Sequence, residues 1–197
     1  MINTDLLIAL GAAYKKVSAG EIIFHEGTQA HFYYQLESGS VKWVSIDDNG
    51  NEFIHKIIQP GECFGEIPLF DHEPHVATAI AEADSVILRL HQSTFQQLLK
   101  DHPEILLSLT RILAERLRYK FLVSKELAAH KPEQTISSRI SHFKKSNLYF
   151  SNDSTQLKLT RQQLASMTGM RVETVIRTMR SMHDKGKLKI ERGRVYC

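Results

Sequence analysis

The sequence has very little cysteine and no long apolar run. Only Cys63 and Cys197 occur among its 197 residues, too few for a disulfide framework or for an iron–sulfur cluster held by four thiolates. The apolar stretch near the start, 6–14, spans nine residues, which is too short to cross a bilayer. No basic segment precedes it, so we expect no secretory signal. These absences favour a reduced, cytoplasmic compartment without membrane contact.

The sequence also lacks the short motifs of common enzymes. It contains no G-x-x-x-x-G-K-[ST], G-x-S-x-G, H-E-x-x-H or G-x-G-x-x-G, so we expect no catalytic residue, no metal and no cofactor. His72 and His75 lie on a turn beside Pro74, and we interpret them as a solvated surface pair rather than ligands. No cation flanks Cys63, which predicts a buried, unreactive thiol.

Charge is distributed unevenly along the chain. Residues 1–129 hold 11 lysines and arginines against 17 acidic residues, a net charge of −6, whereas residues 130–197 hold 14 against 5, a net charge of +9. A basic third joined to an acidic remainder indicates a polyanionic partner for the basic end. The alternative is a basic solvated face with no partner.

The segment 18–92 is typical of β-structure. Turn residues, including the hairpin signal Asn49-Gly50, separate short runs rich in β-branched and aromatic residues. Their spacing predicts a small antiparallel barrel or sandwich, and we assign residues 1–102 to a sensor-like β-barrel domain. The runs are Glu21–His25, Phe32–Glu37, Val41–Ile46, Phe53–Ile58, His75–Ala81 and Val86–Leu90.

A long helix is predicted next. Ser93 is positioned to cap a short helix, 94–100, and residues 103–130 follow with no internal glycine or proline. Two apolar stripes run along this long helix. One can cover the barrel, and the other needs a partner, for which a second copy is the simplest choice; packing within one chain is the alternative. We assign the dimer contact to Ile105, Leu109, Ile112, Tyr119 and Val123, and the neighbouring stripe is Leu106, Leu113, Leu117 and Leu127.

The remainder, 131–197, forms a separate predicted domain. Lys131-Pro132 places a hinge near 129–133, because proline disfavours helix in the residue before it. We expect a helix over 134–146, a polar loop with a short hairpin over 148–159, two further helices, and a closing strand pair, 188–190 and 194–196.

The two helices form the most informative segment. Thr160 and Gln163 have capping-box spacing, so a helix should begin at Arg161, and Gly169 suits the turn that follows. A second helix should run from about residue 171 to Gly186, which acts as its stop. Two short helices around a glycine turn predict a helix-turn-helix. The second helix has Val175, Met179 and Met182 on its buried side and Arg171, Glu173, Thr174, Arg177 and Arg180 exposed.

Glu173 and Arg177 are four residues apart and share one helix face. Arginine can donate two hydrogen bonds to guanine, and glutamate can accept one from cytosine. The alternative is a surface ion pair worth about 0.2–0.5 kcal/mol. With the basic charge and the following strands, which resemble a wing, the pattern favours DNA.

These features together resemble the Crp–Fnr family of bacterial transcription regulators over about residues 15–197. The resemblance rests on 61–70 (GECFGEIPLF), the long helix 103–130, Thr160–Gln163 and Val172–Arg177. It implies an α+β chain with an N-terminal double-stranded β-helix (jelly-roll, cyclic-nucleotide-binding-like), a dimerisation helix and a C-terminal winged helix-turn-helix. It also implies a homodimeric, sequence-specific regulator with RNA polymerase as a partner.

The resemblance assigns roles to individual residues. Glu173 and Arg177 match base-reading positions, and Val172 is typical of the fumarate–nitrate branch, so the site should be of the TTGA…TCAA type; Ile176, where that branch has serine, leaves the outer bases open. Phosphate contacts are expected from Lys158, Thr160, Arg161, Gln162, Arg192 and Arg194.

The resemblance also makes a cyclic nucleotide a poor effector. Gly65-Glu66 matches the family's pocket, but Val76-Ala77 stands where Arg-Ser holds the phosphate, and Lys120-Phe121 replaces the adenine-reading Thr-Ser pair. We therefore expect an unknown or absent effector, with Glu66 a barrel-rim carboxylate beside a basic group. Any effector should act through the hinge. The alternative function is a cyclic-nucleotide-binding-like interaction module with a protein-binding helical tail.

Overall fold

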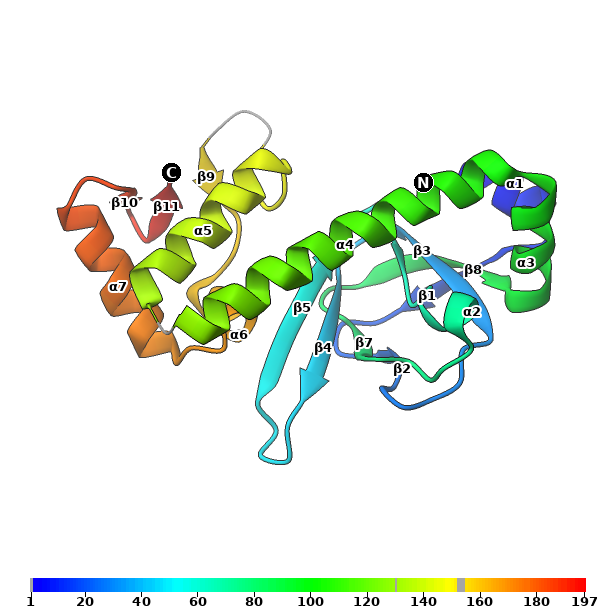
Figure 1. The fold of residues 1–197 in the computed structure, drawn as a ribbon, viewed down its shortest axis with the longest axis horizontal. Coiled ribbons are helices and arrows are strands. Elements are labelled where there is room, and N and C mark those ends of the chain that lie inside the picture. Colours follow the sequence, from blue (N-terminus) through cyan, green and yellow to red (C-terminus); the bar gives the residue numbers. More distant parts are fainter. Residues whose placement is uncertain (1, 130, 152–154) are drawn as a thin grey trace. The chain divides into compact units, whose positions relative to one another are not determined.

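The computed structural model describes residues 2–129, 131–151 and 155–197, and the chain divides into two units, Met1–Arg116 and Leu117–Cys197 (Figure 1). The long helix α4 (Pro103–Ala129) gives its first half to one unit and its second half to the other. The predicted division, which treats residues 103–130 as a separate dimerisation helix, stays a prediction. His130, inside the predicted hinge, lies outside the described residues.

The first unit contains two four-stranded antiparallel sheets. Six of the eight strands described in this unit correspond to the predicted runs. Strands β1 and β6 were not predicted, and neither were the short helices α1 (Thr4–Ala9) and α2 (Pro68–Asp71). One sheet has the order β1 (Ala13–Val17), β8 (Ser85–His91), β3 (Phe32–Ser38) and β6 (Cys63–Phe64). The other has the order β2 (Ile22–Phe24), β7 (Thr78–Ala81), β4 (Val41–Ile46) and β5 (Glu52–Ile58).

Two apolar clusters hold this unit together. One joins residues of both sheets, among them Phe24, Trp43 and Phe64. The other gathers Tyr33 from β3 with side chains of α1, α3 (Gln92–Asp101) and the first half of α4, including Leu109. Helices thus cover part of the barrel, and burial of apolar area stabilises the unit.

The cap of α3 differs from the prediction. His91, at the end of β8, is the N-cap, and its ring nitrogen accepts from the backbone N–H of Ser93 at 3.3 Å. Ser93 already lies inside the helix. The prediction of Ser93 as cap was wrong because a histidine ring nitrogen can also accept an orphan helix N–H.

The second unit combines helices with a small sheet. Its helices besides α4 are α5 (Pro132–Lys145), α6 (Arg161–Thr168) and α7 (Val172–Asp184). Its sheet has the order β10 (Lys189–Glu191), β11 (Arg194–Tyr196) and β9 (Gln156–Leu157), so the closing pair gains a third strand. A bridge between Phe150 and Leu157 lies in the predicted hairpin, of which residues 152–154 are outside the described part. No helix in the described ranges is both long and apolar enough to span a membrane.

The turn between β3 and β4 requires glycine. Gly39 has φ +92°, and a Cβ there would lie 2.6 Å from the carbonyl oxygen of Asp84. Because that atom is backbone, it cannot move aside cheaply. We expect Gly39→Ala to lower the free energy of unfolding by about 2–4 kcal/mol, measured in urea through the fluorescence of Trp43, the single tryptophan. Gly50→Ala is the control: its φ is +79° but no atom lies within 4 Å, so about 1–2 kcal/mol is expected. Equal losses would contradict the steric argument.

Candidate DNA-binding site and barrel interior

The helix-turn-helix is built as its sequence predicts. Thr160 accepts from the backbone N–H of Gln163 at 3.0 Å, and the Gln163 side chain accepts from the N–H of Thr160 at 2.6 Å, a complete capping box. Gly169 ends α6 in the left-handed region at φ +67°, where a Cβ is unfavourable. The turn therefore leads directly into α7.

Helix α7 has one apolar and one polar side. Val175, Met179 and Met182 are buried, at 0–3% exposure, and α7 packs against α5 and α6. The opposite side has Arg171, Glu173, Arg177 and Arg180 exposed and Thr174 half-buried. This burial fixes which side chains α7 presents to solvent.

The alternative of an ion pair between Glu173 and Arg177 is not realised. Neither residue has an ion-pair partner within the described part of the chain. An exposed carboxylate and an exposed guanidinium therefore remain available on one face of α7.

The predicted phosphate contacts all belong to the second unit. Lys158 and Thr160 precede α6 and are exposed, and Arg161 and Gln162 occupy its first turn, where N–H groups lack helical partners. Arg192 and Arg194 are exposed at the turn and in the second strand of the β10–β11 hairpin. Polar and basic side chains thus gather at two places in the second unit, the start of α6 and the β10–β11 hairpin.

A buried charged cluster that no sequence pattern indicated lies between α4 and α5. Arg139 of α5 is 1% exposed and donates from Nε to Glu126 and from Nη1 to the hydroxyl of Tyr119, both on α4. Its guanidinium also lies over the Tyr119 ring, 5.2 Å from the centroid, and His142 stacks on that ring. We call Arg139, Glu126 and Tyr119 the α4–α5 clamp.

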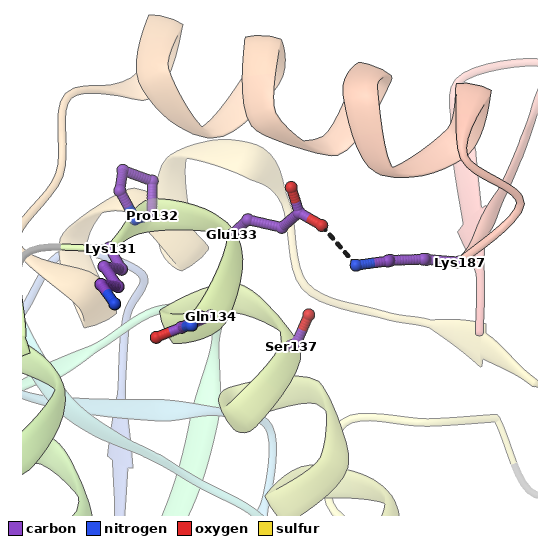
Figure 2. Close-up of a pocket in the computed structure, with 6 residues that line it drawn as sticks. All are labelled: Lys131, Pro132, Glu133, Gln134, Ser137 and Lys187. Atoms are coloured by element: carbon purple, nitrogen blue, oxygen red, sulfur yellow. Dashed lines mark hydrogen bonds and ion pairs between the residues drawn. The ribbon is translucent and has the colours of Figure 1, made fainter.

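A second polar link joins α5 to the turn after α7. Glu133 in the first turn of α5 pairs with Lys185 at 2.7 Å and Lys187 at 2.6 Å. These hydrogen bonds lower the pKa of Glu133 to about 2. Figure 2 shows Glu133 and Lys187 beside Lys131, Pro132, Gln134 and Ser137 in a wide, open pocket of about 650 Å³. The pocket encloses no buried polar group, so it offers a ligand little recognition chemistry.

A buried ion pair lies inside the first unit. Glu66 is fully buried and paired with Arg116 of α4, whose Nη2 also donates to the carbonyl of Cys63 at 2.6 Å. The guanidinium lies 5.8 Å from the ring centroid of Trp43. Glu66 is thus paired with a base as predicted, but it is a core residue rather than a rim carboxylate, because α4 carries the base inward.

Cys63 and His75 are both buried. Burial raises the pKa of the Cys63 thiol to about 11, and neighbouring Glu66 adds to this, which agrees with an unreactive thiol. His75 is 3% exposed and stacks on Phe24 with centroids 3.7 Å apart. Burial lowers the pKa of His75 to about 4, with a smaller effect of His31. The prediction of a solvated His72–His75 pair was therefore wrong for His75, whose ring fits against an aromatic neighbour.

The residues predicted to line an effector pocket are divided between the two units. In the first unit, Gly65 lies against Phe24 and His75, Ala77 is buried at 1% exposure, and Val76 is half exposed. Lys120 and Phe121 belong to the second unit. Burial, with a smaller effect of Arg139, lowers the pKa of Lys120 to about 8. No group of three or more metal-ligating side chains occurs in the residues described.

The predicted dimer stripe lies on the covered side of α4. In the first unit Leu109 is 2% exposed, with Ile105 and Ile112 packed against the same cluster. In the second unit Val123 is 7% exposed and Tyr119 belongs to the clamp. These residues are thus packed or hydrogen-bonded within their own chain. The exposed apolar side chains of α4 are Leu106, Leu107, Leu117, Phe121 and Leu127.

Comparison with known proteins identifies both units. Residues 14–102 match the model of the cyclic nucleotide-binding domain, and residues 140–197 match the Crp-like helix-turn-helix domain. The cAMP-activated global transcriptional regulator CRP of Haemophilus influenzae is 31% identical over 172 residues, which is 86% of this chain and 77% of the relative.

Solved structures share the fold. The c-di-GMP responsive global regulator CLP from Xanthomonas campestris has a TM-score of 0.77 at 23% identity, covering 98% of this chain and 97% of that one. FixK2 from Bradyrhizobium japonicum has a TM-score of 0.78 at 19% identity, covering 94% and 91%.

The ion pair inside the barrel gives a stability test. Glu66→Gln leaves the Arg116 charge buried without its counter-charge, and we expect a loss of about 3–5 kcal/mol in the free energy of unfolding. The double variant Glu66→Leu/Arg116→Met should regain most of it, because an apolar pair needs no desolvation of charge. Urea titration followed by Trp43 fluorescence measures both. A Glu66→Gln protein as stable as the wild type would show that the stability of the unit does not depend on the Glu66–Arg116 ion pair.

Proposed function

The chain belongs to the Crp–Fnr family of transcription regulators, and we propose that it acts as a homodimer on a near-palindromic DNA site of the TTGA type without a cyclic nucleotide. The observation that carries the proposal is the pair of exposed, unpaired side chains Glu173 and Arg177 on one face of α7. A solvated structural helix has no need of this arrangement.

Helix α7 contacts the bases. Its first turns carry Glu173, Thr174 and Arg177, and the N-terminal part of a recognition helix is the part that contacts base edges in the major groove. Arg177 donates to guanine, and Glu173 accepts from cytosine. Arg171 and Arg180 extend the same polar side.

Affinity comes from the phosphates. The first turn of α6 places the backbone N–H groups of Arg161 and Gln162, ahead of the capped N–H of Gln163, beside the side chains of Arg161 and Gln162, and the hairpin turn adds Arg192. Each neutralised phosphate releases counterions, so binding should fall steeply as salt rises. These contacts position the protein without selecting sequence.

The exposed side of α4 forms the dimer contact. Because the stripe of Leu109 and Val123 is already covered inside the chain, the partner takes the other apolar stripe, exposed at Leu106, Leu117 and Leu127. These three positions fit a heptad repeat, the pattern of two helices packed in a coiled coil. Two copies then present two recognition helices to successive major grooves of a near-palindrome.

The barrel does not fit a cyclic nucleotide. Its phosphodiester needs a cation and donors, but Val76 and Ala77 offer neither. The carboxylate of Glu66 is already engaged by Arg116, and the ring of Phe24 fills the space against Gly65. The barrel therefore serves as a folded scaffold for α4.

Selection from a random duplex pool tests the function. The purified protein, without added ligand, is used at two salt concentrations. We expect an inverted repeat with TTGA-like arms, bound more weakly at the higher salt. Salt-sensitive binding without a motif would disprove ligand-independent reading. No binding at either concentration would favour the protein-interaction module instead.

Arg177→Ala tests base reading. We expect a loss of about 1–3 kcal/mol on the selected site and relaxed selectivity at one guanine, because a bidentate base contact is removed. Quantitative gel shifts on the selected duplex and on duplexes substituted at each guanine measure this.

Arg161→Ala is the matched control, since it removes the same charge from α6. It should weaken all duplexes alike and lower the salt slope by about 1. A uniform loss with Arg177→Ala, or a base-selective loss with Arg161→Ala, would contradict the assigned roles.

A further inference from the structure

The α4–α5 clamp bridges the segment predicted to be a hinge. Glu126 and Tyr119 lie on α4 before residue 130, and Arg139 lies on α5 after it, yet all three belong to the second unit. Arg139 is 1% exposed and Glu126 9%. The charged side chains of Arg139 and Glu126 are thus withdrawn from water at the contact between α4 and α5, which would have to open if the two helices moved independently.

The clamp resists opening for an electrostatic reason. A buried charge is tolerated while its counter-charge and hydrogen-bond partners stay in place, and separating the pair leaves both charges poorly solvated. The guanidinium satisfies two acceptors at once and packs on the Tyr119 ring. A swing of α5 away from α4 would break all three contacts together.

The clamp is continuous with the packing of the recognition helix. Ile136 and Phe143 of α5 are buried, as are Val175 and Met179 of α7, and the two helices pack against each other. Glu133 adds ion pairs to the turn after α7. The position of α7 is therefore fixed relative to α5, and the clamp fixes α5 relative to α4.

The same half of α4 carries exposed apolar residues. Leu117 and Leu127 are 59% and 47% exposed, and under the proposed function they face the second copy. One rigid path thus leads from the dimer contact through α4, the clamp and α5 to α7, all within one unit.

We propose that the α4–α5 clamp is a spacing device: Arg139 touches no base, but it fixes the separation of the two recognition helices and so sets the half-site spacing that the dimer accepts. This inference rests on the proposed function. It makes Arg139 a positioning residue.

The experiment compares full sites with single half-sites. Full-length protein is titrated against the selected palindrome, against versions with one base pair added or removed between the arms, and against a duplex with one arm. The variants are Arg139→Met and Glu126→Gln, each of which opens the clamp, and Glu126→Leu/Arg139→Met, which replaces it with apolar contact. Lys145→Met removes an exposed charge from the same helix as a control.

For the wild type and Lys145→Met we expect the native spacing to bind about tenfold or more tightly than the altered spacings, since a rigid link raises effective concentration only where the geometry matches. Arg139→Met and Glu126→Gln should reduce this preference to about threefold or less, while binding to the single arm stays unchanged. The apolar double variant should restore part of the preference. Sedimentation should show every variant still dimeric.

Three results would overturn the inference. The first is an Arg139→Met protein that keeps the wild-type spacing preference. The second is a parallel loss on the single arm and the palindrome, which would mean that the clamp only stabilises the fold. The third is a wild type that reads the arms without preferring a spacing; base reading would then stand and the clamp proposal alone would fall. A wild type that binds neither duplex removes the proposed function as well.

Discussion

The buried guanidinium of Arg139 is the interaction on which the DNA-binding unit depends. At 1% exposure it is withdrawn from water, and Glu126 and the Tyr119 hydroxyl accept its hydrogen bonds. Both partners come from α4, so the unit has to include the second half of that helix. The second unit begins at Leu117, although the matched helix-turn-helix domain within it begins at residue 140. Desolvation, rather than chain connectivity, sets this boundary.

The first unit uses α4 in a similar way. Arg116 carries a charge into the barrel, where Glu66 and the Cys63 carbonyl accept its hydrogen bonds. The buried carboxylate of Glu66 is therefore already paired within the first unit. The same fold can differ in its ligand chemistry through a few side chains, because function depends on the residues of the site rather than on the fold.

Local patterns predicted much of this structure, and long-range contacts account for the rest. The capping box at Thr160, the glycine turn at Gly169 and the buried side of α7 are properties of adjacent residues, and the structure agrees with each. Strand β6 has only two residues and no pattern of its own. The burial of His75 and Glu66 depends on Phe24 and Arg116, which are about fifty residues away in sequence. No local signal identifies such partners.

Helix α4 shows why periodicity alone could not locate the proposed dimer face. Both of its stripes contain apolar residues at intervals of three and four, so spacing cannot tell which stripe the chain covers. Burial decides in favour of Leu109 and Val123 and leaves the heptad positions 106, 110, 113, 117, 120, 124 and 127 for a partner. This second stripe includes the polar residues Thr110, Lys120 and Ser124. Polar residues at the seam of a coiled coil cost stability but restrict its register. A fixed register between two copies of α4 is what a rigid clamp needs if half-site spacing is to be read accurately.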